Sequence, residues 1–116
     1  SNILIFSLQR RHYALGIFLG SVLTLKQFAY TALNGHEQVV QLLLSVGCDP
    51  LIQDNKGSFP MHEAATGGHV QCMDLLWKAG TDLSVRDACN CVPLHYAASG
   101  GHVAAVRWLL EVNAYF

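Results

Sequence analysis

Residues 59–69 read FPMHEAATGGH, and residues 92–102 read VPLHYAASGGH. The two stretches are identical at seven of eleven positions, which are the proline, both histidines, the alanine pair and the glycine pair. They begin 33 residues apart. Similarity at a fixed interval indicates an internal repeat, and a period of about 20 to 50 residues is typical of solenoid proteins.

The same interval extends beyond the two stretches and includes a third, weaker unit upstream. Glycine-histidine pairs stand at residues 35–36, 68–69 and 101–102. Further positions that recur every 33 residues are apolar or acidic: Val40, Met73 and Val106; Leu43, Leu76 and Leu109; Asp54 and Asp87.

Each unit carries signals for two short helices. Pro60 and Pro93 suit the first turn of a helix, where a missing N–H is no loss. The glycine pair ends that helix, and a pattern such as HVQCMDLLWKAG predicts a second one. Gly47 and Gly80 stand where a helix ends in the left-handed conformation, and QDNKG at residues 53–57 predicts a turn.

Two glycines are replaced by asparagine one period later, Gly57 by Asn90 and Gly80 by Asn113. Asparagine tolerates the left-handed region better than other residues with a side chain. We therefore expect both asparagines to keep the backbone conformation of the glycines that they replace.

The motif P-L-H-x-A-A-x-x-G-H at this period resembles the ankyrin repeat over residues 26–116. The resemblance implies an all-α solenoid of stacked helix-turn-helix units with β-turn or hairpin fingers. It also implies that the first histidine of each motif (His62, His95) braces the turn and that the second (His69, His102) organises the loop before the next helix.

The sequence departs from the family pattern in two places. The threonine that opens the family motif is Phe59 and Val92 here, so its hydroxyl hydrogen bond is missing. One period further back than the weak unit, Arg10 would stand at a buried leucine position, so residues 1–25 are not a repeat. We expect an apolar N-terminal segment at 1–25, either a cap or foreign to the repeats, and repeats at 26–57 (degenerate), 58–90 and 91–116 (truncated).

The composition excludes some classes of protein. A chain of 116 residues allows one domain, and 52% hydrophobic residues exclude a disordered polar chain. A net charge of −1 gives no basic stripe for nucleic acid. Four cysteines without the density of a disulfide scaffold favour reduced thiols in an intracellular protein, cytoplasmic or nuclear.

The longest apolar run, at residues 14–25, is shorter than the about 20 residues that span a membrane. Behind Arg10 and Arg11 it resembles the core of a signal peptide. A helix that lies on a surface is the alternative that we favour. Membrane contact is expected only through this run or through flanking regions.

No residue pattern predicts a catalytic centre, a metal or a cofactor. The glycine pair separates the two histidines of each motif, and a zinc site needs four convergent ligands. Cys89 and Cys91 lie near His95, but Cys-x-Cys without a second matching pair is a poor zinc motif. Redox chemistry there requires exposed thiolates, whereas Cys48 and Cys72 fall at core positions. We expect a chain that is not an enzyme.

Stacked units of this kind have a concave side formed by the fingers and one face of the first helices. Aromatic, hydroxyl and oppositely charged side chains there suit a protein partner better than a phosphate backbone. The candidate partner-binding residues are Tyr30, Leu33, Asp54, Lys56, Glu63, Thr66, Arg86, Asp87, Asn90, Tyr96 and Ser99. We expect a non-catalytic interaction module or scaffold for a protein partner that the sequence does not identify.

Two alternatives concern the parent protein. SFPMHEAATGGHVQCMDLL, at 58–76, resembles the repeats of TRPA-type cation channels, which implies the cytoplasmic ankyrin region of a membrane protein. The other is the substrate-receptor part of a ubiquitin ligase, which needs a downstream adaptor-binding box. Residue 116 falls where another turn should begin, so we expect a marginally stable fragment that self-associates through exposed ends.

Overall fold

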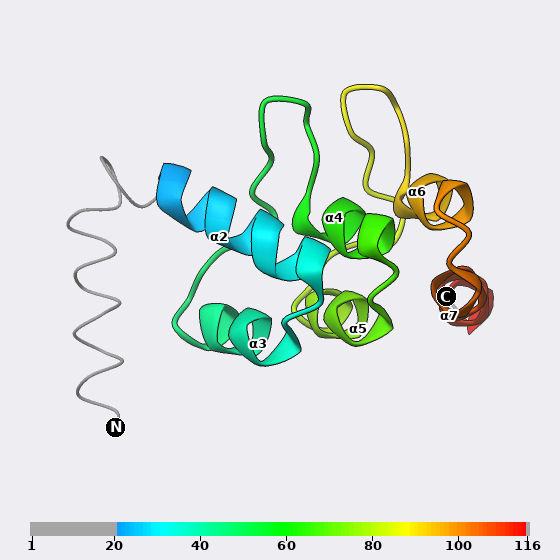
Figure 1. Cartoon of the computed structure of the whole chain (residues 1–116), viewed down its shortest axis with the longest axis horizontal. Coiled ribbons are helices and arrows are strands. Elements are labelled where there is room, and N and C mark those ends of the chain that lie inside the picture. The colour runs from blue at the N-terminus through cyan, green and yellow to red at the C-terminus, as the bar shows by residue number, and fades with distance from the viewer. Residues whose placement is uncertain (1–20, 116) are drawn as a thin grey trace.

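Three helix pairs stand side by side in the computed structural model, which describes residues 21–115 (Figure 1). The helices are α2 (Ser21–Asn34), α3 (Glu37–Ser45), α4 (Pro60–Gly67), α5 (Val70–Lys78), α6 (Pro93–Ser99) and α7 (Val103–Tyr115). In one row α4 packs between α2 and α6, and in the other α5 packs between α3 and α7. Within residues 21–115 there is no β-strand, so the expected all-α solenoid is confirmed.

In the second and third pairs, the first helix begins where the sequence predicts. Pro60 and Pro93 are the first residues of α4 and α6. Ala64 and Ala65 are fully buried, which lets α4 approach both neighbouring helices closely. The hydrophobic core runs through the stack and consists of Phe28, Ala32, Val40, Cys48, Met61, Ala64, Ala65, Cys72, Met73, Leu76, Ala97, Ala105 and Leu109.

The second helices meet through aromatic side chains. Trp77 of α5 and Trp108 of α7 pack edge to face, with ring centroids 6.2 Å apart and planes at 86°. Both indoles are half-buried. The contact therefore joins the second repeat to the third on the side of the stack away from the fingers.

The two asparagine replacements have different outcomes. Gly57 has a φ of 72° and Asn90 a φ of 64°, so Asn90 keeps the left-handed conformation as expected. The expectation for Asn113 is wrong, because α7 continues through this residue to Tyr115. In the described residues Asn90 is the one non-glycine residue with positive φ. A helical residue needs no left-handed conformation, so Asn113 is an ordinary helix position.

The degenerate first unit is helical like the others. Phe28 and Ala32 of α2 are fully buried, as the packing of this unit requires. Helix α2 begins at Ser21, so the proposed boundary between residues 25 and 26 falls inside a helix. Residues 14–20, the larger part of the apolar run, lie outside the described residues. Within residues 21–115 no helix has both the length and the apolar character needed to cross a membrane.

Candidate functional site

The two connections between successive helix pairs, residues 46–59 and 79–92, project from the helices, and we call them the fingers (Figure 1). In each finger one aspartate side chain fixes the turn. Asp54 Oδ1 accepts hydrogen bonds from the main-chain N–H groups two and four residues later, at 2.9 and 2.8 Å. Asp87 Oδ1 makes the same two bonds one period later, at 3.0 and 2.9 Å. These turns satisfy main-chain donors that would otherwise need water. Both aspartates therefore shape the fingers.

The two fingers are joined to each other. The main-chain N–H of Ala88 donates to the carbonyl oxygen of Lys56 at 2.9 Å. A Cβ atom on Gly57 would lie 2.8 Å from the Ala88 nitrogen, so the approach of the two backbones requires a glycine. The tips are thus positioned relative to one another by the main chain, independently of their side chains.

A buried histidine connects the second repeat to the third. His62 Nδ1 accepts a hydrogen bond from the N–H of Phe59 at 3.1 Å, which leaves Nε2 as the protonated nitrogen. Nε2 then donates to the carbonyl oxygen of Cys91 at 2.9 Å. The expectation that this histidine braces the turn is confirmed. The bond from the Phe59 N–H to the His62 ring stabilises this turn, where Phe59 replaces the threonine that is typical of the family.

The second histidine of the last motif also bonds to a neighbouring repeat. His102 Nε2 lies 2.8 Å from the carbonyl oxygen of Thr66, near the end of α4. The loop between α6 and α7 is thereby tied to the repeat before it. This agrees with the role that the family resemblance implies for His102.

Tyr96 lies over the base of the second finger. Its hydroxyl donates to Asp87 Oδ2, and its ring meets His62 edge-on at a centroid distance of 5.6 Å. This hydrogen bond is the main cause of the lowered pKa of Asp87, and the hydrogen bond from the N–H of Cys91 lowers the pKa further. The same bond raises the pKa of Tyr96 above its ordinary value. The Tyr96 hydroxyl is therefore engaged within the chain, and its ring is half-buried.

The candidate partner-binding residues divide by exposure. Those with exposed side chains are Tyr30, Lys56, Thr66, Arg86, Asn90 and Ser99. Those that are half-buried are Leu33, Asp54, Glu63, Asp87 and Tyr96. The structure joins Asp87 to Tyr96 directly, whereas Thr66 uses its hydroxyl within α4, where it donates to the His62 carbonyl at 2.8 Å.

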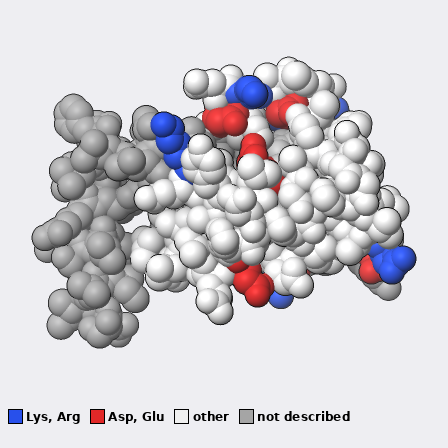
Figure 2. Space-filling model, in the orientation of Figure 1, with Lys and Arg blue, Asp and Glu red and all other residues white. Residues whose placement is uncertain are grey.

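Ser58 is a residue that the sequence analysis missed. Its hydroxyl donates to Glu63 Oε1 at 3.2 Å, which directs that carboxylate toward the base of the first finger. Ser58 stands at the end of the turn, five residues before Glu63. A hydroxyl at this position is the sequence signal from which the contact could have been predicted. Acidic and basic groups lie close together on the finger side of the molecule, over a surface that is otherwise mostly uncharged (Figure 2).

The cysteines differ in environment and are all reduced. Cys48 and Cys72 are buried, as expected, and burial raises the pKa of Cys72 to about 11, with a smaller contribution from Glu37. Cys89 is exposed and Cys91 half-buried in the second finger. In the described part of the chain no three histidine, cysteine or acidic side chains gather as a metal site would require.

Stacked helix pairs with aspartate-held fingers define a solenoid repeat protein. A family model for ankyrin repeats in three copies matches residues 28–116, and the chain belongs to the ankyrin repeat family. Ankyrin repeats are generally protein–protein interaction modules without catalytic activity. A search of curated proteins found no match, so the channel and ubiquitin-ligase alternatives stay predictions.

Proposed function

We propose that this chain is a non-catalytic module that binds a protein partner through its concave surface. By concave surface we mean the two fingers together with the exposed side chains of α2, α4 and α6. The observation that carries the proposal is that hydrogen bonds within the chain fix the fingers, while side chains on them stay exposed. Lys56, Arg86 and Asn90 are exposed on this fixed backbone.

Preorganisation of this kind favours binding, because less conformational entropy is lost when a partner orders the surface. Asp54, Asp87 and His62 set the backbone of the fingers and act as positioning residues. The residues that touch the partner are then those that project from this frame, and Tyr30 is the exposed aromatic among them. Aromatic side chains are the usual anchors of protein interfaces.

The mixed charge of the finger side also supports a protein partner. A surface for nucleic acid needs a run of basic side chains that neutralises phosphates, whereas acidic and basic groups alternate here. No cofactor or metal enters this proposal.

Site-specific crosslinking tests the proposal. A photoreactive residue is placed at Tyr30 or Thr66 on the concave surface, and at Gln71, which is exposed on α5, as a matched control. We expect one partner protein to be crosslinked from Tyr30 and Thr66 and not from Gln71. The Tyr30→Ala variant should then bind that purified partner at least tenfold more weakly, about the effect of a hot-spot side chain. Equal crosslinking from Gln71 contradicts the proposal.

A further inference from the structure

The second finger carries two thiols that its turn does not require. Cys89 and Cys91 stand one period after Lys56 and Ser58. The first finger makes the same turn with those two residues, because its aspartate accepts the same pair of main-chain hydrogen bonds. Cys89 is exposed and Cys91 only half-buried, so neither belongs to the hydrophobic core. The finger therefore forms its turn without thiols at these positions.

The same turn brings the two cysteines close together. Their main-chain N–H groups donate to one oxygen, Asp87 Oδ1, at 3.0 and 2.9 Å. Asn90 between them has a φ of 64°, a left-handed conformation that is more compact than an extended chain. Even in an extended chain, Cα atoms two residues apart are at most about 7 Å from each other. A disulfide joins Cα atoms about 4.4 to 6.8 Å apart, so this turn places the pair within its range.

The sulfur of Cys91 already lies over the other cysteine. Its thiol donates a weak hydrogen bond to the carbonyl oxygen of Cys89, with 3.8 Å between Sγ and the oxygen. The Cys89 side chain is exposed, and exposed side chains change rotamer rapidly. Rotation of the Cys89 side chain is therefore the main movement that an S–S bond between the two residues requires.

We propose that Cys89 and Cys91 are a redox-modification site that closes to a reversible disulfide, with glutathione disulfide as the oxidant. The Cys89 thiolate attacks one sulfur of glutathione disulfide, which forms a mixed disulfide and releases one glutathione thiolate. The Cys91 thiolate then attacks the Cys89 sulfur, which forms the internal bond and releases the second glutathione. The protons of the two protein thiols pass to the two released glutathione thiolates. The protein thus loses two electrons, and glutathione disulfide gains them.

Exposure and ring size make this disulfide labile. Cys89 reacts first because it is exposed, and half-buried Cys91 resolves the mixed disulfide. A ring that encloses only Asn90 between the cysteines constrains the unfolded chain little, so the bond adds little stability. Exposed disulfides are readily reduced. A disulfide of this kind is therefore transient in a reducing compartment, as redox-sensing disulfides are.

Oxidation acts on the finger at two points. The carbonyl oxygen of Cys91 accepts the hydrogen bond from His62, so the disulfide constrains a residue that links two repeats. Asn90, between the cysteines, is one of the exposed side chains of the proposed binding surface. The effect on a partner rests on the proposed function, whereas the disulfide itself does not.

The test uses the full chain, equilibrated with reduced and oxidised glutathione in varied ratios. Iodoacetamide then blocks the free thiols, and mass spectrometry identifies the modified peptides. Cys89→Ser and Cys91→Ser are the matched variants, because each leaves one thiol of the pair and the first finger has serine at the Cys91 position. Cys48 and Cys72 are buried and serve as internal controls that stay reduced in the folded protein.

In wild type, the peptide with both finger cysteines should lose two hydrogen atoms and take up no iodoacetamide. Dithiothreitol should reverse the change. Cys91→Ser should instead hold glutathione on Cys89, because no second thiol displaces it, and Cys89→Ser should react little. A wild-type protein without the internal disulfide at any ratio overturns the proposal, and so does a glutathione adduct or an intermolecular disulfide in its place.

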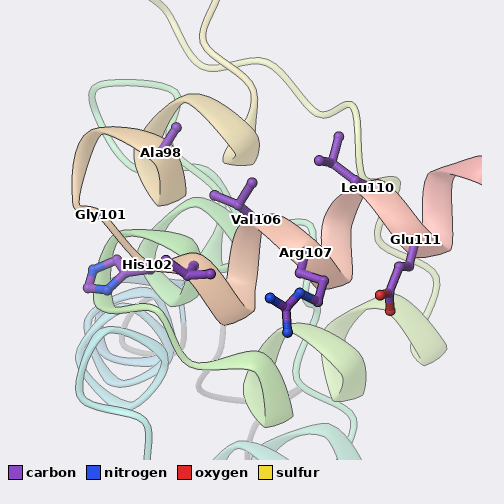
Figure 3. A pocket seen from close by; sticks show the side chains of 8 residues that line it. Ala98, Gly101, His102, Val106, Arg107, Leu110 and Glu111 are labelled. Atoms are coloured by element: carbon purple, nitrogen blue, oxygen red, sulfur yellow. The ribbon is translucent and has the colours of Figure 1, made fainter.

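Nuclear magnetic resonance locates the effect of oxidation. The main-chain signals of residues 87–92 should shift in the oxidised protein. Val106 and Leu110 provide reference signals that should not shift, because the groove of about 420 Å³ that they line contains no residue of either finger (Figure 3). Equal shifts at the groove would show that oxidation changes the whole fold, which contradicts a site confined to the second finger.

Discussion

His62 and Cys91 bond two repeats together although they stand 29 residues apart, with 2.9 Å between Nε2 and the carbonyl oxygen. The imidazole is buried and its other nitrogen accepts the N–H of Phe59. Both ring nitrogens thus have hydrogen-bond partners inside the protein. Loss of the ring leaves the N–H of Phe59 and the carbonyl oxygen of Cys91 without the bonds that they make to it. His95, its equivalent one period later, is exposed and accepts a bond from Val92 at 3.0 Å.

We expect His62→Ala to lower the free energy of unfolding by about 2 to 4 kcal/mol, the range for loss of a buried side chain with paired hydrogen bonds. His95→Ala should cost about 1 kcal/mol or less, because water can replace its partner. Urea denaturation followed by circular dichroism measures both values. Equal losses in the two variants would show that the bond to Cys91 contributes nothing.

Tyr96 and Asp87 should act as one unit in stability. Tyr96→Phe removes the hydroxyl that bonds the carboxylate, and Asp87→Asn replaces the charged acceptor while the side chain keeps its size. Each substitution should lower the urea midpoint. The double variant should lose clearly less than the two single losses together, because each substitution takes away the same charge-assisted hydrogen bond. Additive losses would contradict this coupling.

The same pair predicts a plateau in the dependence of stability on pH. The folded pKa of Asp87 is lowered, so its contribution is complete above its ordinary pKa of 3.8 and is lost as pH falls through the folded value. The folded pKa of Tyr96 is raised, so its contribution is complete below its ordinary pKa of 10.0 and is lost as pH rises through the folded value. Denaturation at about pH 3 and about pH 7 should show a smaller difference in Asp87→Asn than in wild type. An unchanged difference would contradict the assignment to Asp87.

The parts of the fold that the sequence predicts are those with local causes. Pro60 and Pro93 begin helices because proline suits the first turn. Gly57 and Asn90 share a left-handed backbone because both tolerate it. The repeat period then determines how these local pieces stack, so the solenoid follows from the spacing of the motif.

Contacts between repeats and at the ends of helices could not be predicted in this way. The bond from His62 to Cys91 depends on the register of two stacked repeats, which the motif alone does not define. The orientation of the Tyr96 hydroxyl depends on how close the second finger comes to α6. Asn113 continues a helix because the helical hydrogen bonds around it outweigh its preference for a turn. In the candidate site, the exposure of a side chain could be predicted more readily than its hydrogen-bond partners within the chain.

Gly57→Ala should be more destabilising than Gly101→Ala. The two glycines have nearly the same φ, 72° and 71°, so alanine meets the same backbone strain at each, about 1 to 2 kcal/mol. A Cβ on Gly101 meets no atom within 4 Å, whereas on Gly57 it lies 2.8 Å from the main-chain nitrogen of Ala88. The difference in unfolding free energy between the two variants therefore measures the cost of the steric clash between the two fingers. Equal losses would mean that the fingers separate at little cost.

The four thiols should react in an order set by burial. Cys89 is exposed and should be alkylated by iodoacetamide first, with half-buried Cys91 next. Cys48 and Cys72 are buried, and at neutral pH a pKa of about 11 leaves Cys72 almost wholly in the unreactive thiol form. Mass spectrometry of the native protein should therefore show two modified cysteines, and of the protein in urea four. Modification of Cys72 at the rate of Cys89 in the native state would contradict its burial between α3 and α5, because only an open repeat junction exposes that sulfur.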